Sequence, residues 1–423
     1  MKILVVGSGG REHAIAHALA RSPQQPELLC APGNPGIRAL ARQVASGQEV
    51  DEVVAAAQAE GVDLVVVGPE APLVAGLVDA LQAVDIPAFG PSAAAAQLEG
   101  SKTFAKEIMI AAGVPTGGHA VVATVDEGLA AITSYPAVVK FDGLAAGKGV
   151  VIAVDEAAAR EALVDMLETK VFGDGEVFVE EFLEGDEVSL LALCDGERAI
   201  PLAPARDFKR ALDGDEGPNT GGMGAFSPVP GVDPDTLAEY SAIVHQPIVD
   251  ELARRGTPFH GVLYAGLMLT AAGPRVLEYN TRFGDPETQV VLPRLRSDLA
   301  DLMLRATRPG GLAGAELDVD PRSAVTVVLA SRGYPASSSK GDVIEGVDAA
   351  GALDDVTVFH AGTGGGEGDA PLVTNGGRVL AVTALGDALG SARERAYAGA
   401  ESIAFDGRQL RGDIALAASR LPA

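Results

Sequence analysis

Apolar runs and polar, glycine-rich turns alternate along the first part of the chain. Lys2–Val6 is a continuous apolar run, typical of a buried parallel strand, and a helical pattern over Arg11–Ala20 follows it after a glycine turn. A further run, Asp63–Val67, ends in a Gly-Pro turn, and a weaker one ends near Phe89–Ser92. Strands that alternate with helices in this order predict a doubly wound parallel sheet over residues 1–101.

The pattern changes from residue 102 onward. After a predicted helix over 102–112, short strands are predicted at 138–140, 151–154 and 177–180. A glycine loop joins the first two strands directly, which predicts an antiparallel unit over about 121–188.

Longer apolar strands are predicted in the rest of the chain. A central unit over 189–323 completes a middle region of 102–323. Residues 324–423 contain further predicted strands, at 324–330, 356–361 and 379–383, and they should form a separate α+β unit.

One stretch, Val276–Glu287, begins as an apolar strand and ends in a polar turn with glycine and proline. Side chains alternate faces along a strand, so Leu277 and Tyr279 are expected on one face. Glu278 and Asn280 are expected on the other face, about 7 Å apart. A carboxylate and an amide oxygen on one ridge can together hold a hard cation such as magnesium.

Composition narrows the class of protein. The 423 residues carry 32 Lys+Arg against 58 Asp+Glu, a formal net charge of −26, which argues against nucleic-acid binding. Cys30 and Cys194 are far apart and form neither a disulfide framework nor a metal-ligand pattern. The apolar runs are too short for a membrane span or a signal peptide. We therefore expect a cytoplasmic protein with no membrane or nucleic-acid partner. We also expect a monomer whose partners are small molecules, although neither of these two expectations follows from composition.

Glycine loops suggest sites for anions. Gly7–Gly10 lies between a predicted strand and a helix N-terminus, where backbone N–H groups favour a phosphate. A Rossmann dinucleotide site is the alternative, but Glu12 and His13 stand where the third glycine of its fingerprint belongs. The loop Gly68–Leu73 follows another strand and should lie at the same edge of the sheet.

Lysines accompany a second glycine loop. Lys140 ends a predicted strand and precedes Asp142–Gly149, while Lys102 and Lys106 lie one turn apart on a predicted helix. The loop joins two strands, so it is neither a Walker A loop nor a Rossmann turn, both of which enter a helix. Such a loop can fold over a triphosphate, which Lys140 would contact as a point charge.

Two further segments carry candidate chemistry. Glu180–Leu183 resembles an interdomain hinge whose backbone can bind an adenine edge, with Glu187 accepting from ribose hydroxyls. Pro204–Arg210 is a basic cluster within an acidic chain. It precedes Gly217–Ala225, whose glycine and proline content predicts an irregular, functional loop rather than regular secondary structure.

Taken in order, these motifs resemble the ATP-grasp superfamily, and within it the phosphoribosylamine–glycine ligase family. The resemblance covers the whole chain and is strongest in the run Arg-Phe-Gly-Asp-Pro-Glu at 282–287. The motifs that carry it are Gly7–His13, Gly68–Leu73, Gly100–Lys102, Asp142–Gly149, Gly217–Gly224, Arg282–Glu287 and Thr374–Arg378. It implies an ATP-grasp fold, of mixed α/β and α+β class, with an N-terminal doubly wound domain, an antiparallel lid and a C-terminal α+β domain.

The resemblance also implies a reaction. ATP, glycine and 5-phosphoribosylamine would give glycinamide ribonucleotide, ADP and phosphate, a step of purine biosynthesis. Glycine would first form an acyl phosphate, which the amine then attacks. Magnesium or manganese would serve as the cofactor and ATP as a co-substrate. Both steps develop negative charge, so positioning and charge stabilisation should dominate catalysis.

Residue roles are implied by matching the motifs. The metal ligands would be Glu278 and Asn280, and the catalytic residues Arg282, Asp207 and Lys140. ATP would be bound by Lys102, Lys140, Gly143, Gly147, Lys148, Gly149, Glu180, Glu181, Leu183 and Glu187. The substrates would be bound by Gly9, Gly10, Glu70, Pro72, Asn219, Gly221, Gly222, Met223 and Arg282. Asp207 and Arg282 would bind the substrate glycine.

The chain departs from the family pattern in three places, one of which is Phe141, where a small residue is common before Asp-Gly-Leu. The strand Tyr264–Met268 has no acidic residue, which leaves a second metal without a protein ligand. Arg206 and Phe208 replace the glutamine and histidine that often flank Asp207 in the family. Two alternatives stay open here: an ATP-grasp ligase with another acid or amine, and a nucleotide-binding protein without turnover.

Overall fold

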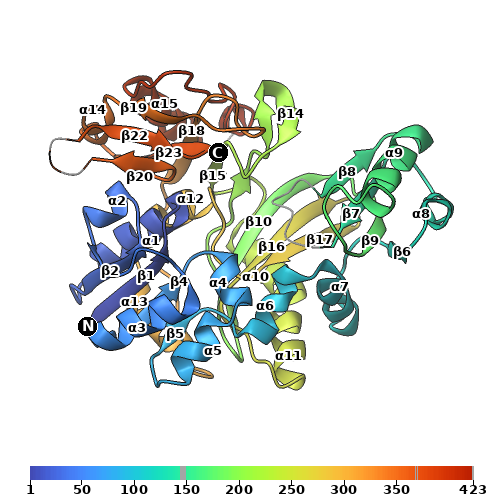
Figure 1. The fold of residues 1–423 in the computed structure, drawn as a ribbon, viewed down its shortest axis with the longest axis horizontal. Coiled ribbons are helices and arrows are strands. Elements are labelled where there is room, and N and C mark those ends of the chain that lie inside the picture. The colour runs from blue at the N-terminus through green and yellow to red at the C-terminus, as the bar shows by residue number, and fades with distance from the viewer. Residues whose placement is uncertain (143–148, 367, 369, 422–423) are drawn as a thin grey trace.

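The computed structural model describes residues 1–142, 149–366, 368 and 370–421. Its N-terminal unit is a parallel sheet in the order β3-β2-β1-β4-β5 (Figure 1). The strands are β1 (Lys2–Gly7), β2 (Glu27–Pro32), β3 (Arg42–Gln43), β4 (Leu64–Val67) and β5 (Ala88–Phe89). The helices between and after them are α1 (Gly10–Ala20), α2 (Pro35–Arg38), α3 (Val50–Glu60), α4 (Glu70–Val74), α5 (Leu77–Gln82) and α6 (Ala93–Gly100).

Helices cover both faces of this sheet. Ile3 and Val5 of β1 share a core with residues of α1. Leu4 and Val6 point to the opposite face and share a core with residues of α3 and α5. The predicted doubly wound parallel sheet is therefore confirmed, and its chain reversal places the loops after β1 and β4 at one edge.

An antiparallel lid sheet follows α7 (Lys102–Ala111), in the order β6-β9-β7-β8 (Figure 1). Its elements are β6 (His119–Val122), α8 (Val125–Ala131), β7 (Ala137–Phe141), β8 (Val150–Ala153), α9 (Glu156–Leu167) and β9 (Val177–Glu181). Val139 and Val179 face α9 and form the lid core. Register places Lys140 opposite Phe178 and Glu180 opposite Val138, so these side chains share the other face.

The central sheet is also antiparallel, in the order β11-β10-β16-β17. Its strands are β10 (Asp186–Asp195), β11 (Ala199–Pro201), β16 (His260–Thr270) and β17 (Gly273–Asn280). The helices of this part are α10 (Pro234–Val244), α11 (Gln246–Arg254), α12 (Thr288–Val291) and α13 (Leu299–Ala306). No helix of the described residues is long and apolar enough to cross a membrane.

The C-terminal unit is built on a sheet in the order β12-β15-β18-β23-β20, which lies beside the N-terminal unit in Figure 1. Its strands are β12 (Arg206–Asp207), β15 (Gly224–Ser227), β18 (Ser323–Ala330), β20 (Val356–His360) and β23 (Arg378–Gly386). A smaller sheet, β19-β22-β21, and two helices complete it: β19 (Lys340–Val343), α14 (Val347–Gly351), β21 (Thr363–Gly365), β22 (Leu372–Asn375) and α15 (Leu389–Glu401). Because β12 and β15 precede residue 323, the middle of the chain supplies two strands of this sheet.

The structure corrects the expectation that Gly217–Ala225 is wholly irregular. A hairpin of β13 (Arg210–Leu212) and β14 (Glu216–Asn219) includes the first part of this segment. β15 begins at Gly224, which leaves only residues 220–223 as a turn. Glycine and proline are tolerated here because β14 is an exposed edge strand that pairs on one side only.

The strand alternation predicted around Glu278 is also corrected. Gly266 pairs with Glu278 and Leu267 pairs with Val276, so Leu277 is the extra residue of a β-bulge. Val276 and Tyr279 are therefore the buried pair, and Leu277 is only half-buried. The bulge leaves Glu278 exposed, on the side away from the core.

Candidate active site

Glu278 and Asn280 lie at the end of β17, next to a group of cations. Within the described part of the chain, the Glu278 carboxylate has no hydrogen-bond or ion-pair partner. Partial desolvation opposes its ionisation, but Lys209, Lys140 and nearby cations hold its pKa below the ordinary value. We call Lys102, Lys140, Lys209 and Arg282 the cation cluster.

Lys140 of this cluster and the neighbouring Lys106 lie near a buried carboxylate, that of Glu180. Lys106 Nζ is 2.8 Å from Glu180 Oε1, and Lys140 Nζ contacts Glu180 Oε2. Burial alone would raise the pKa of Glu180, but Lys140 and Lys106 hold it below its ordinary value. Burial lowers the pKa of Lys102, and the negative charges of Asp142 and Glu278 oppose this lowering. The three predicted residues Lys102, Lys140 and Glu180 therefore lie on one surface between α7 and the lid sheet.

The base of the predicted glycine loop is fixed on α7. Asp142 Oδ1 accepts from Lys102 N at 2.6 Å, and its Oδ2 accepts from Ser101 Oγ at 3.1 Å. At the other end, Gly149 O accepts from Phe141 N at 2.8 Å. Asp142 thus places the start of the loop at the N-terminus of α7. Three predicted ATP-binding residues lie outside the described residues: Gly143, Gly147 and Lys148.

The predicted hinge joins the lid to the central sheet. Leu183 is buried, and Glu181 is exposed and pairs with Arg275 at 3.1 Å. Glu187, on β10, accepts from Lys209 Nζ at 2.8 Å. The hinge thus brings its acidic end next to the cation cluster.

Asp207 belongs to a polar group beside this cluster. Burial raises the pKa of Asp207 to about 7; Lys209 opposes the rise, while Glu287 and Glu187 add to it. Asp207 and Glu187 raise the pKa of Lys209 well above its usual value, although burial opposes them. Glu287 is buried and accepts from Tyr264 OH at 2.9 Å. Asp207 is therefore a carboxyl group that titrates near neutral pH.

Arg282 is surrounded by acceptors. Its Nη2 lies 2.9 Å from Glu99 Oε1 and donates to Asn280 Oδ1 at 3.0 Å. Its Nε lies 3.5 Å from Glu70 Oε2. Burial opposes its charge, but Glu99 and Glu70 raise its pKa. Arg282 therefore links the predicted metal ligand Asn280 to the predicted substrate residue Glu70.

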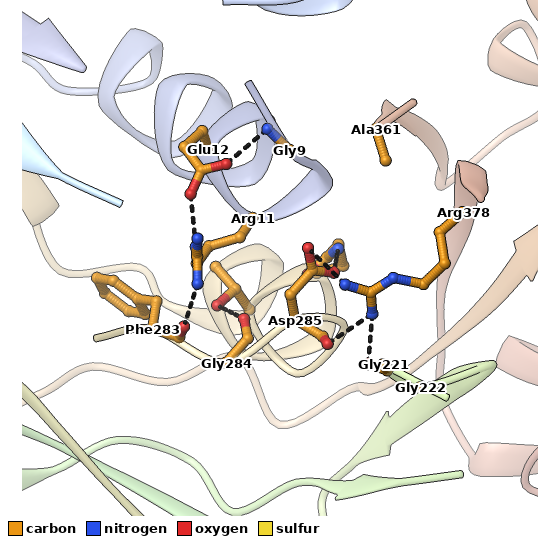
Figure 2. Close-up of polar contacts among 12 residues, drawn as sticks. Gly9, Arg11, Glu12, Gly221, Gly222, Phe283, Gly284, Asp285, Ala361 and Arg378 are labelled. Carbon is orange, nitrogen blue, oxygen red and sulfur yellow. Dashed lines mark hydrogen bonds and ion pairs between the residues drawn. The ribbon is translucent and has the colours of Figure 1, made fainter. Parts of the chain in front are cut away.

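A separate pocket of about 490 Å³ opens between the N-terminal and C-terminal units. Asp285 lies inside it, with Oδ1 accepting from Gln289 Nε2 at 2.7 Å and Oδ2 lying 3.2 Å from Arg378 Nη2. Arg378 Nη1 also donates to Asp285 O at 2.7 Å and to Gly221 O at 2.5 Å. Figure 2 shows how Arg378 reaches from β23 to join the Gly221 turn to Asp285.

The N-terminal wall of this pocket is the glycine turn before α1. Gly9 N donates to Glu12 Oε2 at 2.6 Å, and a Cβ at Gly9 would lie 3.6 Å from Asp285 Oδ2 (Figure 2). A Cβ at Gly10 would lie 2.7 Å from Gln289 Nε2. A Cβ at Gly9 would thus come closest to Glu12 Oε2, at 2.7 Å, rather than to Asp285, and one at Gly10 would displace the end of the Gln289 side chain. The Gly9 N–H is already used within the turn.

The other predicted substrate residues lie at different depths. Gly9 lines the pocket, while Gly221 and Gly222 lie behind Arg378 and Pro286. Pro72 and Met223 are buried, and Asn219 is exposed on β14. The structure therefore brings only part of the predicted substrate set to one surface.

Several pocket residues were missed by the sequence reasoning. They are Asn34, Arg38, Asp285, Thr363, Asn375 and Arg378. Two motifs already contained a signal, since Asp285 and Arg378 belong to runs that carry the family resemblance. No local pattern marks Asn34, whose Nδ2 donates to His360 O at 2.7 Å across the interface between units.

Gly222 provides a test of the turn that supports Asp285. Its φ is +109°, and a Cβ there would overlap Pro286 Cδ. We expect Gly222→Ala to lower the free energy of unfolding by about 1–3 kcal/mol. The matched control is Gly214→Ala, where φ is +71° but a Cβ would meet no described atom within 4 Å; there the cost should be about 1 kcal/mol. Urea unfolding measures both, and equal losses would contradict the close contact.

The residues at β17 suit a magnesium ion. Glu278 supplies an unpaired carboxylate, and Asn280 Oδ1 has a second lone pair beyond the one that Arg282 uses. Across the described residues, no three His, Cys, Asp or Glu side chains form a metal-binding group. Magnesium commonly takes one or two protein ligands together with substrate phosphates, so this small donor set fits it.

The arrangement of sheets recurs in other proteins. The biotin carboxylase domain of the Hydrogenobacter thermophilus 2-oxoglutarate carboxylase, solved with MgADP, superposes with a TM-score of 0.72 at 17% identity, over 97% of this chain and 91% of that one. At this identity the match shows the fold alone. The fold, with lysines and a Glu-x-Asn ridge between its lid and central sheets, defines an ATP-grasp enzyme.

Family profiles of phosphoribosylglycinamide synthetase match three segments: the N domain at 1–99, the ATP-grasp (A) domain at 100–288 and the C domain at 324–417. The chain belongs to this family, the phosphoribosylamine–glycine ligases.

Relatives of this family match along nearly the whole chain. A phosphoribosylamine–glycine ligase of Streptomyces coelicolor is 54% identical over 430 residues, spanning 99% of this chain and 100% of the relative. One of Xanthomonas axonopodis is 50% identical, spanning 98% and 97%. The crystal structure of the Thermotoga maritima phosphoribosylamine–glycine ligase has a TM-score of 0.82 at 34% identity, covering 98% of this chain and 100% of that one.

Proposed function

We propose that this chain ligates glycine to 5-phosphoribosylamine through a glycyl phosphate intermediate. The ligase activity follows from membership of the family: ATP, glycine and phosphoribosylamine give glycinamide ribonucleotide, ADP and phosphate in purine biosynthesis. The observation that best supports the proposed site is the unpaired Glu278 carboxylate within the cation cluster. Such a carboxylate is typical of a magnesium–nucleotide site, where metal and phosphates complete the charge balance.

In the first step, a glycine carboxylate oxygen attacks the γ-phosphorus of ATP and ADP leaves. We propose that Lys140 and Lys102 bind the phosphates and that Glu278 and Asn280 hold magnesium or manganese. When bound, the metal neutralises charge on the phosphate oxygens. The adenine would lie against the open face of the lid sheet, where Val121 and Ile152 are exposed, with its edge at the hinge near Leu183.

Asp207 and Arg282 are the proposed glycine-binding residues. An ionised Asp207 can accept hydrogen bonds from the glycine ammonium, and the Arg282 guanidinium can orient the carboxylate. Arg282 is already held by Glu99 and Glu70, so its orientation is fixed before substrate binds.

In the second step, the amine attacks the acyl carbon, phosphate leaves and the amine loses a proton. The pocket suits a substrate with both an amine and a phosphate, because it contains the Asp285 carboxylate and two guanidinium groups, Arg38 and Arg378. We propose that Asp285 binds the amine. Arg38, with the Gly9–Gly10 turn, would bind the phosphate.

Substrate-dependent ADP release tests this function. We expect release only when glycine and phosphoribosylamine are both present, and no release when either is replaced with a homologue that lacks the reacting group. ADP release that ignores glycine would instead favour an ATP-grasp ligase for another acid. We further propose that the protein is cytoplasmic and a monomer. Equilibrium sedimentation can measure whether it is a monomer in solution.

The pKa of Asp207 leads to a pH prediction. Its carboxyl pKa is raised to about 7, so it becomes protonated as the pH falls through neutrality and loses the charge that binds an ammonium group. We expect kcat/KM for glycine to fall about tenfold per pH unit below that point. Asp207→Asn should lower the rate and remove this acidic limb. A wild-type profile that stays flat down to about pH 5.5 would contradict the role.

A further inference from the structure

The C-terminal segment after α15 contacts the hairpin that carries Lys209 at its base. Arg411, in this segment, is 1% exposed. Its Nε and Nη2 donate to the two carboxylate oxygens of Asp413, both at 2.7 Å. Its Nη1 donates to Asp215 Oδ1 at 2.8 Å and to Arg210 O at 3.2 Å.

Backbone contacts strengthen the same junction. Gly412 N donates to Asp213 Oδ1 at 2.7 Å, and Gly214 N donates to Asp413 Oδ2 at 2.8 Å. Burial opposes the charge of Arg411, but its bonds to Asp413 and Asp215 raise its pKa, so it stays charged. The hairpin between β13 and β14 is therefore fixed to the C-terminal unit, beside which it lies in Figure 1.

Arg411 also contacts the strand that leads into this hairpin. Its guanidinium carbon lies 4.9 Å from the centre of the Phe208 ring. Phe208 stands between Asp207 and Lys209, and its backbone pairs with Gly224 and Met223 at 3.0 and 2.7 Å. Since neighbouring side chains on an extended segment alternate, a Phe208 ring held toward Arg411 directs its two neighbours the other way.

We propose that Arg411 is a positioning residue that orients Asp207 and Lys209 toward the cation cluster by holding Phe208 and the β13–β14 hairpin. This inference rests on the proposed function, because it assumes that Asp207 and Lys209 serve the reaction. It explains the departure of this chain at position 208: the phenyl ring packs under a guanidinium from the C-terminal unit and has no direct role toward substrate.

The test compares Arg411→Met with Arg393→Met. Arg393 is a matched control, because it bonds Ile414 O and Gly412 O at 3.0 and 2.6 Å and lies over Tyr397, so it holds the same segment without touching the hairpin. We expect both variants to lower the thermal midpoint. Only Arg411→Met should lower kcat/KM for glycine, by about tenfold to a hundredfold, while KM for phosphoribosylamine stays within about twofold.

The pH profile separates positioning from a merely structural role. Asp207 faces Lys209, Glu187 and Glu287, with Tyr264 beside them, and Lys209 is the cation that lowers its pKa. A misplaced Lys209 should therefore move the acidic limb of kcat/KM to higher pH in Arg411→Met and leave it in place in Arg393→Met. Kinetics and profiles that match in the two variants would overturn the proposal.

A milder variant covers the case in which Arg411→Met does not fold. Asp215 is largely exposed, so Asp215→Asn should fold and weaken only the hairpin side of the junction. It should shift the acidic limb in the same direction, and an unshifted limb would overturn the proposal. Lys209→Met separates this proposal from the proposed function. Full activity there would overturn the positioning proposal, because Lys209 would then not serve the reaction, whereas ADP release that ignores glycine in the unaltered chain would refute the proposed function.

Discussion

Glu278→Gln is expected to lower kcat for ADP release by about 10³-fold while the protein stays folded. The amide keeps the size of the side chain but removes the one negative charge that β17 presents to the cation cluster. The phosphates would then face Lys102, Lys140 and Lys209 without a metal held in place. Magnesium-dependent binding of an ATP analogue, measured by calorimetry, should weaken in parallel.

A matched control separates this loss from a general charge effect. Glu161 is exposed on α9, on the far side of the lid from the site, and Glu161→Gln makes the same chemical change. Its kcat should stay within about twofold of the wild type. Unchanged turnover in Glu278→Gln would refute the metal assignment. A comparable loss in Glu161→Gln would show that the loss is a general effect of removing a negative charge and not one of Glu278.

Asp285→Asn is expected to lower kcat/KM for phosphoribosylamine by about 10²–10³-fold. Gln289 and Arg378 both face the oxygens of this carboxylate, so the amide keeps one of these two contacts and turns its NH2 toward a donor in the other. The amide oxygen can still accept, but the negative charge that would bind the incoming amine is lost. Steady-state kinetics with phosphoribosylamine as the varied substrate measures the effect.

The binding of an ATP analogue distinguishes the effect of Asp285→Asn from that of Glu278→Gln. It should be unchanged in Asp285→Asn and weakened in Glu278→Gln, because we propose that the first residue binds phosphoribosylamine and that the second holds the metal at the nucleotide. Asp301→Asn, at a half-exposed position of α13, serves as the surface control. Loss of nucleotide binding in Asp285→Asn would mean that the two sites are not separate.

Local patterns were enough to predict much of the fold. The continuous apolar run at Lys2–Val6 requires burial on both sides, and helices do cover both faces of β1. The strand-to-strand connection at Asp142–Gly149 likewise predicted an antiparallel pair, which β7 and β8 form. Each of these elements is specified by its own residues and their immediate neighbours.

Pairing between distant segments could not be predicted in the same way. Glu216–Asn219 forms a strand because Arg210–Leu212 is available as its partner and the C-terminal unit holds the hairpin. The bulge at Leu277 depends on the register with β16, which the sequence of β17 does not specify. Such features arise from tertiary contacts that override local propensity.

The candidate site shows the same division. Glu278 and Asn280 are two residues apart, so their shared side of a strand could be inferred from spacing alone. The pocket around Asp285 could not, since Asn34, Thr363 and Arg378 come from distant parts of the chain. Motifs on single elements were enough to predict Glu278, Asn280, Lys102 and Lys140, whereas the pocket around Asp285 is built by residues from three units.

The central claim is that Glu278 and Asn280 hold the metal that accompanies the phosphates of ATP. The most direct test is a crystal of the full chain with manganese and a non-hydrolysable ATP analogue, with the manganese located by anomalous scattering. We expect a peak bonded to Glu278 and Asn280 and to phosphate oxygens, with Lys140 at the phosphates. A metal bound elsewhere, with the Glu278 carboxylate away from the nucleotide, would contradict it.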